Sequence, residues 1–286
     1  MIAPKKKILV PVDFSDSSFD ALRFAAAVGH KIDAEIIVIH IIETYKYNSR
    51  IKQVLDYSEV LEKEVAQSID DFRTDHPGLW GLKTEVKIRN GKIYKEILIA
   101  AEEENVDMIV MGTQGSGGLG DLERYFLGSN AYRVVYKSKV PVITLKSVPD
   151  KIHLDRMILA LDVDKGTNEK VAKAMSWAKI FGMDICLTTV SEISDELLSK
   201  GDKLQKKLDE LSQSIEAEGI LCGTKVIRKE DVANGVIKHA IESQATMITI
   251  MTSKESILTD LFLGSTARRI IQKSPIPVLS THPSRK

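Results

Sequence analysis

The chain has 286 residues, of which 43% are hydrophobic and 28% are charged, and its 40 basic and 40 acidic side chains leave no net charge. Length and composition indicate two globular domains rather than a disordered chain, and the charge balance argues against a nucleic-acid partner, which usually requires a basic surplus. The N-terminus lacks the apolar core of a secretory signal, and no apolar run reaches the roughly 18 residues of a membrane span, so we expect a cytoplasmic protein without a membrane partner.

Short apolar segments alternate with longer amphipathic segments along the first half of the chain. The expected strands lie at roughly 7–12, 36–42, 83–89, 107–111 and 140–145. The expected helices run from the serines at 15–18 to about residue 30, and over roughly 54–72, 92–104 and 129–138. This alternation is typical of a parallel sheet with helices on both faces. It predicts an open, doubly wound sheet, which binds ligands beyond the carboxyl ends of its strands.

The second half of the chain repeats the first. Residues 7–41 lie without a gap over residues 156–190. Residues 88–89, 107–112, 126–129 and 140–143 then match residues 227–228, 246–251, 262–265 and 276–279 in the same order. A repeat of this length indicates two copies of one domain. We therefore expect an α/β domain with five parallel strands over residues 1–149 and a second over residues 150–286.

The cysteines and histidines do not suggest a metal site. Cys186 and Cys222 lack metal-ligand spacing, and the six histidines are scattered along the chain. We therefore expect buried structural thiols.

Asp13 directly follows the first expected strand and precedes a run of serines. Its carboxylate can accept hydrogen bonds from ribose hydroxyls, or it can help to cap the helix that follows. The sequence alone leaves both interpretations open.

A glycine-rich segment follows the fourth expected strand and contains Gly112, Gly115, Gly117, Gly118 and Gly120. Farther on, Gly128 and Ser129 open the last helix of the repeat. Glycines let backbone amides approach an anion, and a helix N-terminus adds unpaired amides and a positive dipole end. Phosphate binding is therefore one interpretation. The alternative is a surface loop before a helix that Ser129 simply caps.

Two familiar phosphate motifs do not apply. Residues 115–120 match G-x-G-x-x-G, but the dinucleotide fold needs that motif in the first strand-to-helix turn, where residues 12–15 hold no glycine. No lysine followed by serine or threonine completes a Walker loop after Gly117. The sequence therefore carries no signature of fast phosphoryl transfer.

Together these residues resemble the universal stress protein (UspA-like) family, whose domains carry G-x-x-G, nine residues, and then G-S or G-T before the last helix. The resemblance covers nearly the whole chain twice, including residues 11–15 and 140–142 of the first repeat. It implies two tandem Rossmann-like domains of the adenine nucleotide alpha hydrolase-like type. It also implies that the first repeat binds ATP, with Mg, through Pro11, Asp13, Ile41, Met111, Gly112, Gly115, Gly128, Ser129 and Asn130.

The spacing departs from the family pattern in the first repeat. Twelve residues separate Gly115 from Gly128, whereas a frame on Gly115 and Gly118 restores nine. We prefer Gly112 and Gly115 because they keep the strand alignment, which leaves the role of Gly118 undecided.

The second repeat keeps the spacing but has Met251 and Lys254 in place of the two glycines, nine residues before Gly264. A side chain at Met251 would crowd a phosphate, so we expect weak or absent nucleotide binding there. Because domains of the family associate through their last strands, the resemblance implies intramolecular pairing of residues 140–145 with 276–280. It also allows a homodimer.

Three functions are compatible with these observations. The leading hypothesis is a nucleotide-dependent regulator of the stress response that binds ATP, acts on an unidentified protein partner, and is not an enzyme, any hydrolysis of ATP being slow. The alternative is a nucleotide-free scaffold that acts through protein contacts alone. A third, an adenylate-forming or electron-transfer enzyme, would require catalytic bases or cofactor ligands near the glycine loop, and none stands out in the sequence.

Overall fold

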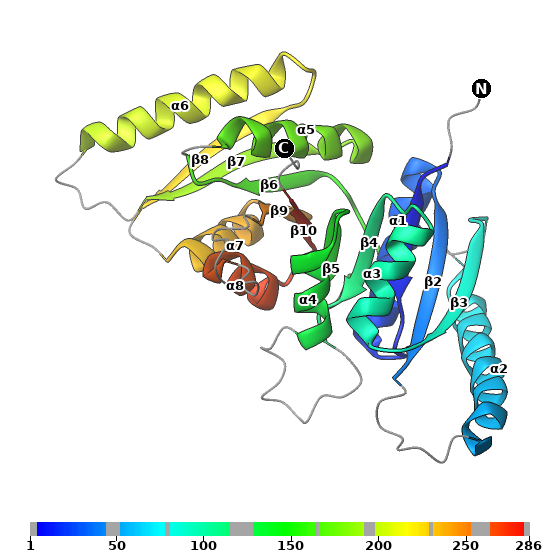
Figure 1. The fold of residues 1–286 in the computed structure, drawn as a ribbon. Helices are drawn as coiled ribbons and strands as arrows, with labels where there is room; N and C mark the ends of the chain where they lie inside the picture. Colours follow the sequence, from blue (N-terminus) through cyan, green and yellow to red (C-terminus); the bar gives the residue numbers. More distant parts are fainter. Residues whose placement is uncertain are drawn as a thin grey trace. The chain divides into compact units, whose positions relative to one another are not determined.

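The computed structural model describes residues 5–43, 52–77, 81–114, 128–163, 166–191, 198–228, 231–252 and 264–282. These residues form two compact units, and the division between the units falls between Val142 and Ile143. Both units are α/β, with parallel strands and flanking helices (Figure 1).

The first unit contains four parallel strands in the order β3-β2-β1-β4. They are β1 (Lys7–Pro11), β2 (Glu35–Ile42), β3 (Thr84–Asn90) and β4 (Met108–Gly112). Its helices are α1 (Asp16–Ile32), α2 (Lys52–Asp75), α3 (Ile93–Glu103) and α4 (Ser129–Lys137). A further strand, β5 (Val142–Leu145), lies at the division between the two units.

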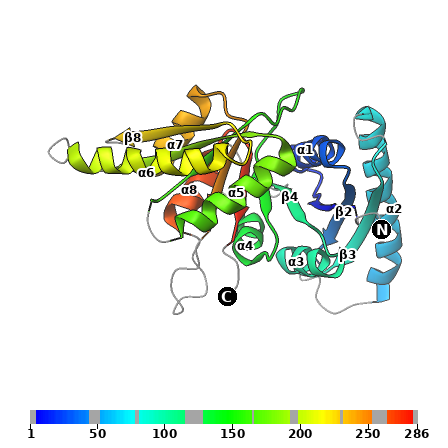
Figure 2. The same ribbon diagram turned by 90° about the horizontal axis from the view of Figure 1, so that it is seen from above.

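The sheet of the first unit is covered on both faces (Figure 2). On one face α1 lies beside α2, and the rings of Phe19 and Phe72 stack with their centroids 4.3 Å apart. On the other face α3 packs against α4. Ile8, Leu9 and Val10 of β1 are fully buried, as expected for a strand covered on both sides. Burying each such side chain contributes roughly 1.5–3 kcal/mol before the entropy cost of ordering it.

Local sequence sets the two ends of α1. Its N-cap is Ser15, whose hydroxyl accepts a hydrogen bond from the amide of Ser18 at 3.3 Å. At the other end Asp33 adopts a left-handed conformation with φ 50°, and its amide donates back to the carbonyl of Gly29. The start of α1 is thereby fixed directly after the turn that carries Asp13.

The second unit has the same arrangement, with parallel strands in the order β8-β7-β6-β9-β10. They are β6 (Arg156–Ala160), β7 (Asp184–Ser191), β8 (Cys222–Arg228), β9 (Met247–Met251) and β10 (Val278–Thr281). Its helices are α5 (Thr167–Phe181), α6 (Leu198–Glu216), α7 (Val232–Glu242) and α8 (Ser265–Lys273).

The predicted α/β fold with a parallel sheet and flanking helices is confirmed. Every strand and helix expected in the first repeat is present, with ends shifted by no more than three residues. The domain boundary at residues 149 and 150 and the pairing of the last strands stay predictions. No helix in the described parts of the chain is long and apolar enough to cross a bilayer.

Both cysteines are half-buried rather than fully buried. Burial raises the pKa of each thiol above its usual value. In the β7–β8 pair Cys186 lies opposite Gly223, and Cys222 lies opposite Ile185. Because successive residues of a strand point to opposite faces, the two thiols lie on opposite sides of the sheet. The cysteines are therefore two separate thiols.

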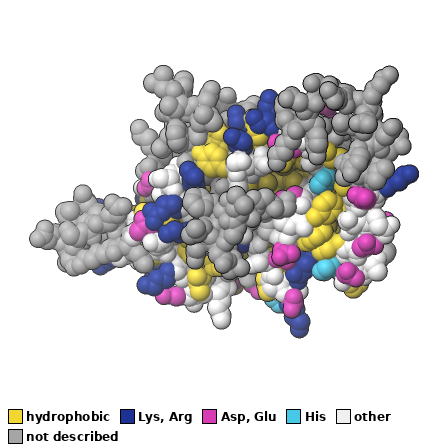
Figure 3. Space-filling view, turned by 90° about the horizontal axis from the view of Figure 1, so that it is seen from below, with side chains coloured by type: hydrophobic (Ala, Val, Ile, Leu, Met, Phe, Trp, Pro, Cys, Tyr) yellow, Lys and Arg dark blue, Asp and Glu magenta, His cyan; other side chains and the backbone are white. Residues whose placement is uncertain are grey.

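Acidic and basic side chains lie beside one another on the face drawn in Figure 3. This arrangement agrees with the absence of net charge on the chain. The charged side chains of interest for ligand binding are therefore those that have no oppositely charged neighbour.

Candidate functional site

A pocket of about 140 Å³ lies at the carboxyl ends of β1, β2 and β4 in the first unit. Its walls come from these strand ends, the start of α1, and the first turns of α3 and α4. The lining residues are Pro11, Val12, Asp13, Ser18, Ile41, Ile93, Ile97, Met111, Gly112, Thr113, Gln114, Gly128, Ser129, Asn130 and Ala131. An open parallel sheet binds its ligands at this edge.

The structure brings most of the predicted site residues together. Those that line the pocket are Pro11, Asp13, Ile41, Met111, Gly112, Gly128, Ser129 and Asn130. Gly115 lies outside the described residues, as do Gly117, Gly118, Gly120 and Lys254. Residues from four separate segments thus face one cavity, as expected from the position of the strand ends.

Sequence reasoning missed the contribution of α3. Ile93 and Ile97 lie one helical turn apart and form an apolar wall of the pocket. The signal was present, because two isoleucines four residues apart define one face of a helix. That this face lies beside the ends of β1 and β4 depends on how α3 packs, which the spacing alone does not reveal.

Asp13 both lines the pocket and organises the turn before α1. Its Oδ1 accepts hydrogen bonds from the Ser15 amide at 3.2 Å and the Ser15 hydroxyl at 2.6 Å. The amide of Asp13 donates to the Ser18 hydroxyl at 3.3 Å. The two interpretations of this carboxylate are therefore compatible, since helix capping orients the side chain at the cavity wall.

Phe14, between Asp13 and Ser15, has φ 64°, a left-handed conformation that is costly for a bulky side chain. Its ring packs against His40, with centroids 4.9 Å apart. His40 Nδ1 in turn lies 2.8 Å from the carbonyl oxygen of Val12. Side-chain packing from β2 thus holds the strained turn on which Asp13 sits.

Gly112 is required by packing at the end of β4. A Cβ atom built there would lie 2.9 Å from both the carbonyl carbon and the carbonyl oxygen of Ser17 and would clash with the Ser17 hydroxyl. That hydroxyl donates to the carbonyl of Gln114 and joins the start of α1 to the segment after β4. Close contact between α1 and β4 therefore explains this glycine independently of any bound anion.

The start of α4 differs from the sequence-based expectation. Gly128, not Ser129, is the N-cap, and it has no side chain to make a capping bond. The sequence predicts that the Gly128 amide is free to bind an anion. In the structure this amide instead donates to the Thr113 carbonyl at 2.9 Å. The amides that follow, from Ser129 to Ala131, belong to the first turn, where the helix itself supplies no acceptor. The residues that carry these amides line the pocket.

The second unit replaces the close contact at Gly112 with a different pair of residues. Met251 ends β9 at the place of Gly112, and Gly166 stands at the place of Ser17. Gly166 is the N-cap of α5 and has φ 90°, so α5 begins two positions later than α1 in the aligned repeats. The missing glycine at the strand end is thus accompanied by a new glycine at the helix start.

Comparison with known proteins gives one consistent result. The model of the universal stress protein family matches residues 5–146 and again residues 153–282. A universal stress protein from Mycolicibacterium smegmatis is 24% identical over 291 residues, which covers 96% of this chain and 97% of that protein. Universal stress protein MJ0531 from Methanocaldococcus jannaschii is 32% identical over 143 residues, which covers 49% of this chain and 82% of that protein. The crystal structure of a universal stress protein from Archaeoglobus fulgidus has a TM-score of 0.71 at 27% identity and covers 97% of this chain and 98% of its own.

Proposed function

Since the chain belongs to the universal stress protein family and carries its domain twice, we propose that the first unit binds ATP and acts as a nucleotide-dependent regulator of the stress response. The observation that supports this proposal is the pocket at the carboxyl edge of the sheet, which joins an apolar wall, a carboxylate and a helix N-terminus. In this proposal the regulator works in the cytoplasm and signals its nucleotide state to a protein partner.

The apolar part of the pocket suits an adenine ring. Val12, Ile41, Ile93, Ile97 and Met111 supply this wall. Burial of the two faces of a flat base against such side chains is favourable because it removes apolar surface from water. The carboxylate of Asp13 lies at the same cavity and can accept hydrogen bonds from ribose hydroxyls.

The start of α4 suits the phosphates. First-turn amides and the positive end of the helix dipole bind phosphate oxygens without any special side chain. The pocket volume of about 140 Å³ is below the roughly 300–1,000 Å³ of sites that enclose a whole drug-sized ligand. In this proposal the pocket receives the base, with the ribose at Asp13, and the phosphate chain extends outward past α4.

A magnesium ion suits this outer position. Mg²⁺ in nucleotide sites takes most of its ligands from phosphate oxygens and water. The described residues contain no group of three or more acidic, histidine or cysteine side chains that could hold a metal. Mg²⁺ would accordingly arrive with the ATP phosphates rather than occupy a protein site of its own.

We do not propose an enzyme. Asp13 is the only carboxylate that lines the described pocket, and it already orients the turn before α1. The turnover of MgATP should stay well below the roughly 1–100 per second of kinases. Release of ADP at a rate of roughly 1–100 per second would contradict the proposal that this unit only binds ATP.

Isothermal titration calorimetry with MgATP tests the proposal. Ser129 is exposed at the first position of α4, so Ser129→Ala should leave the fold intact. In this proposal the Ser129 hydroxyl adds one hydrogen bond to the phosphates beside those of the amides, and its loss should weaken ATP binding about 3- to 10-fold. Ser265 is exposed at the first position of α8 and provides the matched control. Ser265→Ala should bind ATP as the wild type does.

Mass spectrometry of small molecules released from freshly purified protein provides a second test. An adenine nucleotide is the expected result. A protein that carries none and gives no heat with ATP would instead be the nucleotide-free scaffold.

A further inference from the structure

Two cations share one aromatic ring beside the pocket. The Nζ atom of Lys92 lies 5.3 Å from the centroid of the Tyr94 ring. The guanidinium carbon of Arg133 lies 5.1 Å from the same centroid. Lys92 precedes α3 and Arg133 belongs to α4, and these two helices pack against each other. Both cations are half-buried, and a ring face attracts such charges without neutralising them.

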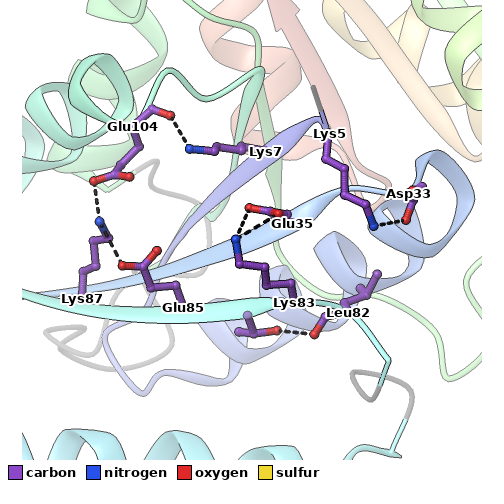
Figure 4. Close-up of polar contacts among 10 residues, drawn as sticks. Lys5, Lys7, Asp33, Glu35, Leu82, Lys83, Glu85, Lys87 and Glu104 are labelled. Carbon is purple, nitrogen blue, oxygen red and sulfur yellow. Dashed lines mark hydrogen bonds and ion pairs between the residues drawn. The ribbon is translucent and has the colours of Figure 1, made fainter. Parts of the chain in front are cut away.

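Within the described ranges, neither Lys92 nor Arg133 forms an ion pair with a carboxylate. The lysines at the opposite edge of the same sheet behave differently (Figure 4). Lys87 lies between Glu85 and Glu104, and the Lys83 Nζ atom lies 3.0 Å from Glu35 Oε2. The Lys92–Arg133 pair therefore differs from Lys83 and Lys87, whose charges are paired with carboxylates.

The second unit shows what these positions do when their charges are paired. Asp231 is the N-cap of α7, the place that Lys92 occupies before α3. Its carboxylate accepts from the Asn234 amide at 3.1 Å and from both terminal nitrogens of Arg269 at 2.7 Å each. Arg269 is the fifth residue of α8, as Arg133 is of α4. The first unit thus keeps the arginine but replaces its acidic partner with a second cation.

Lysine is a poor choice for the helix itself. Lys92 makes no side-chain capping bond, and its charge lies at the positive end of the dipole of α3. A residue that is unfavourable for its own element is often found at a functional site. The neighbours agree with this, because Ile93, next to Lys92, and Ser129, one turn before Arg133, both line the pocket.

We propose that Lys92 and Arg133 bind the phosphate chain of the nucleotide and that Tyr94 holds the two cations at the pocket edge. This inference rests on the proposed function, since it assigns the charges that would select a triphosphate. The guanidinium can bind phosphate oxygens through two parallel hydrogen bonds, and the ammonium adds a compact positive charge. The pair would therefore favour ATP over AMP and contribute little to the binding of adenosine.

The second unit supplies the design of the test. Lys92→Asp recreates the Asp231 arrangement, with a capping carboxylate opposite an arginine, so the variant should fold with an unchanged or higher thermal midpoint. Its affinity for ATP, measured by calorimetry, should fall about tenfold or more, because the exchange removes one cation and engages the other. Its affinity for adenosine should stay within about twofold of the wild type.

Two further variants serve as partner and control. Arg133→Gln should also lower the affinity for ATP but not that for adenosine. Lys95 is exposed three residues farther along the chain and is not one of the two cations over the Tyr94 ring, so Lys95→Asp makes the same change of charge outside the proposed site. Because water and salt screen an exposed charge, this variant should bind ATP within about twofold of the wild type.

The outcomes separate this inference from the proposed function. Equal binding of ATP by the wild type, Lys92→Asp and Arg133→Gln would overturn the inference and leave nucleotide binding in place. An equal loss of ATP and adenosine binding would overturn it as well, because the residues would then act through the fold of the pocket. A wild-type protein that binds neither ligand would contradict the proposed function itself.

Discussion

Gly112 shows at the scale of one residue that a motif glycine can be needed for packing. Its missing side chain lets the Ser17 backbone approach the end of β4. We expect Gly112→Ala to lower the free energy of unfolding by roughly 1–3 kcal/mol, because the added methyl group forces backbone apart. Urea denaturation measures this change.

Gly223→Ala is the control for that substitution. A Cβ atom there would meet the Cys186 sulfur at 3.8 Å, an ordinary contact. Replacing a glycine within a strand by alanine should leave stability unchanged or slightly raised. If Gly112→Ala is as stable as the wild type, the contact between α1 and β4 is not tight.

Asp231 gives a pH-dependent prediction at the same scale. Hydrogen bonds from Arg269 and from the Asn234 amide hold the pKa of its carboxyl below the usual value. A lowered pKa in the folded state means that the stabilisation is present above the unfolded pKa of about 3.9 and is lost as the pH falls through the folded value. Asp231→Asn keeps a capping side chain and removes only the charge. We expect a lower thermal midpoint than the wild type at pH 7.

The difference between Asp231→Asn and the wild type should begin to shrink as the pH falls below about 4, where the carboxyl of the unfolded chain takes up a proton. It should disappear below the lowered folded pKa, where the carboxyl of the folded wild type is neutral as well. Thermal denaturation over a pH series measures it. A difference that stays constant from neutral to acidic pH would show that the charge contributes nothing.

At the scale of the element, α1 and the turn before it form one cooperative structure. Ser15 caps α1 and also donates to the carboxylate of Asp13. We expect Ser15→Ala to lower the free energy of unfolding by about 1 kcal/mol through loss of the cap. The same variant should weaken ATP binding because Asp13 loses the hydroxyl bond and keeps only the bond from the amide of residue 15.

Ser214→Ala is a suitable control, since this exposed serine only donates to the Leu211 carbonyl within α6. Thermal denaturation and calorimetry together measure both effects. Normal ATP binding by Ser15→Ala would show that Asp13 does not depend on the cap.

The elements themselves were predictable because each carries its own periodic pattern. Strands such as β1 are continuous apolar runs because both sides of the sheet are covered. The residues at the ends of β1, β2 and β4 were predictable for the same reason, since parallel topology brings those ends to one edge. This reasoning found Asp13 and Ile41, which lie far apart in the sequence.

Details that depend on contacts between elements were not predictable. The amide of Gly128 is used by Thr113 because the two segments lie side by side, and no local pattern shows that contact. No pattern in the sequence singles out Lys92 and Arg133, because their shared contact with the Tyr94 ring depends on how α3 packs against α4. The comparison with the second unit shows that, among the described residues, the first unit lacks an ion pair here, because Asp231 and Arg269 at the corresponding positions form one.

At the scale of the whole molecule, the two units should respond differently to nucleotide. The first unit has Gly112, the Lys92–Arg133 pair and the pocket, whereas the second has Met251 and Asp231 in place of Gly112 and Lys92. At an ATP concentration a hundred times the dissociation constant, binding stabilises a folded unit by about 2.7 kcal/mol. We therefore expect ATP to raise one of two unfolding transitions in differential scanning calorimetry and to leave the other in place. A parallel rise of both would contradict a single site.

The exchange of Gly112 and Ser17 for Met251 and Gly166 has a consequence for engineering. A binding site grafted into the second unit could not be built one substitution at a time. Serine at residue 166 alone would inherit a φ of 90°, which disfavours L side chains, and lysine at residue 231 alone would face Arg269. Strand end, helix start and cap would have to be redesigned together. Because α5 itself starts two positions later than α1, restoring the side chains alone would not restore the arrangement of the first unit.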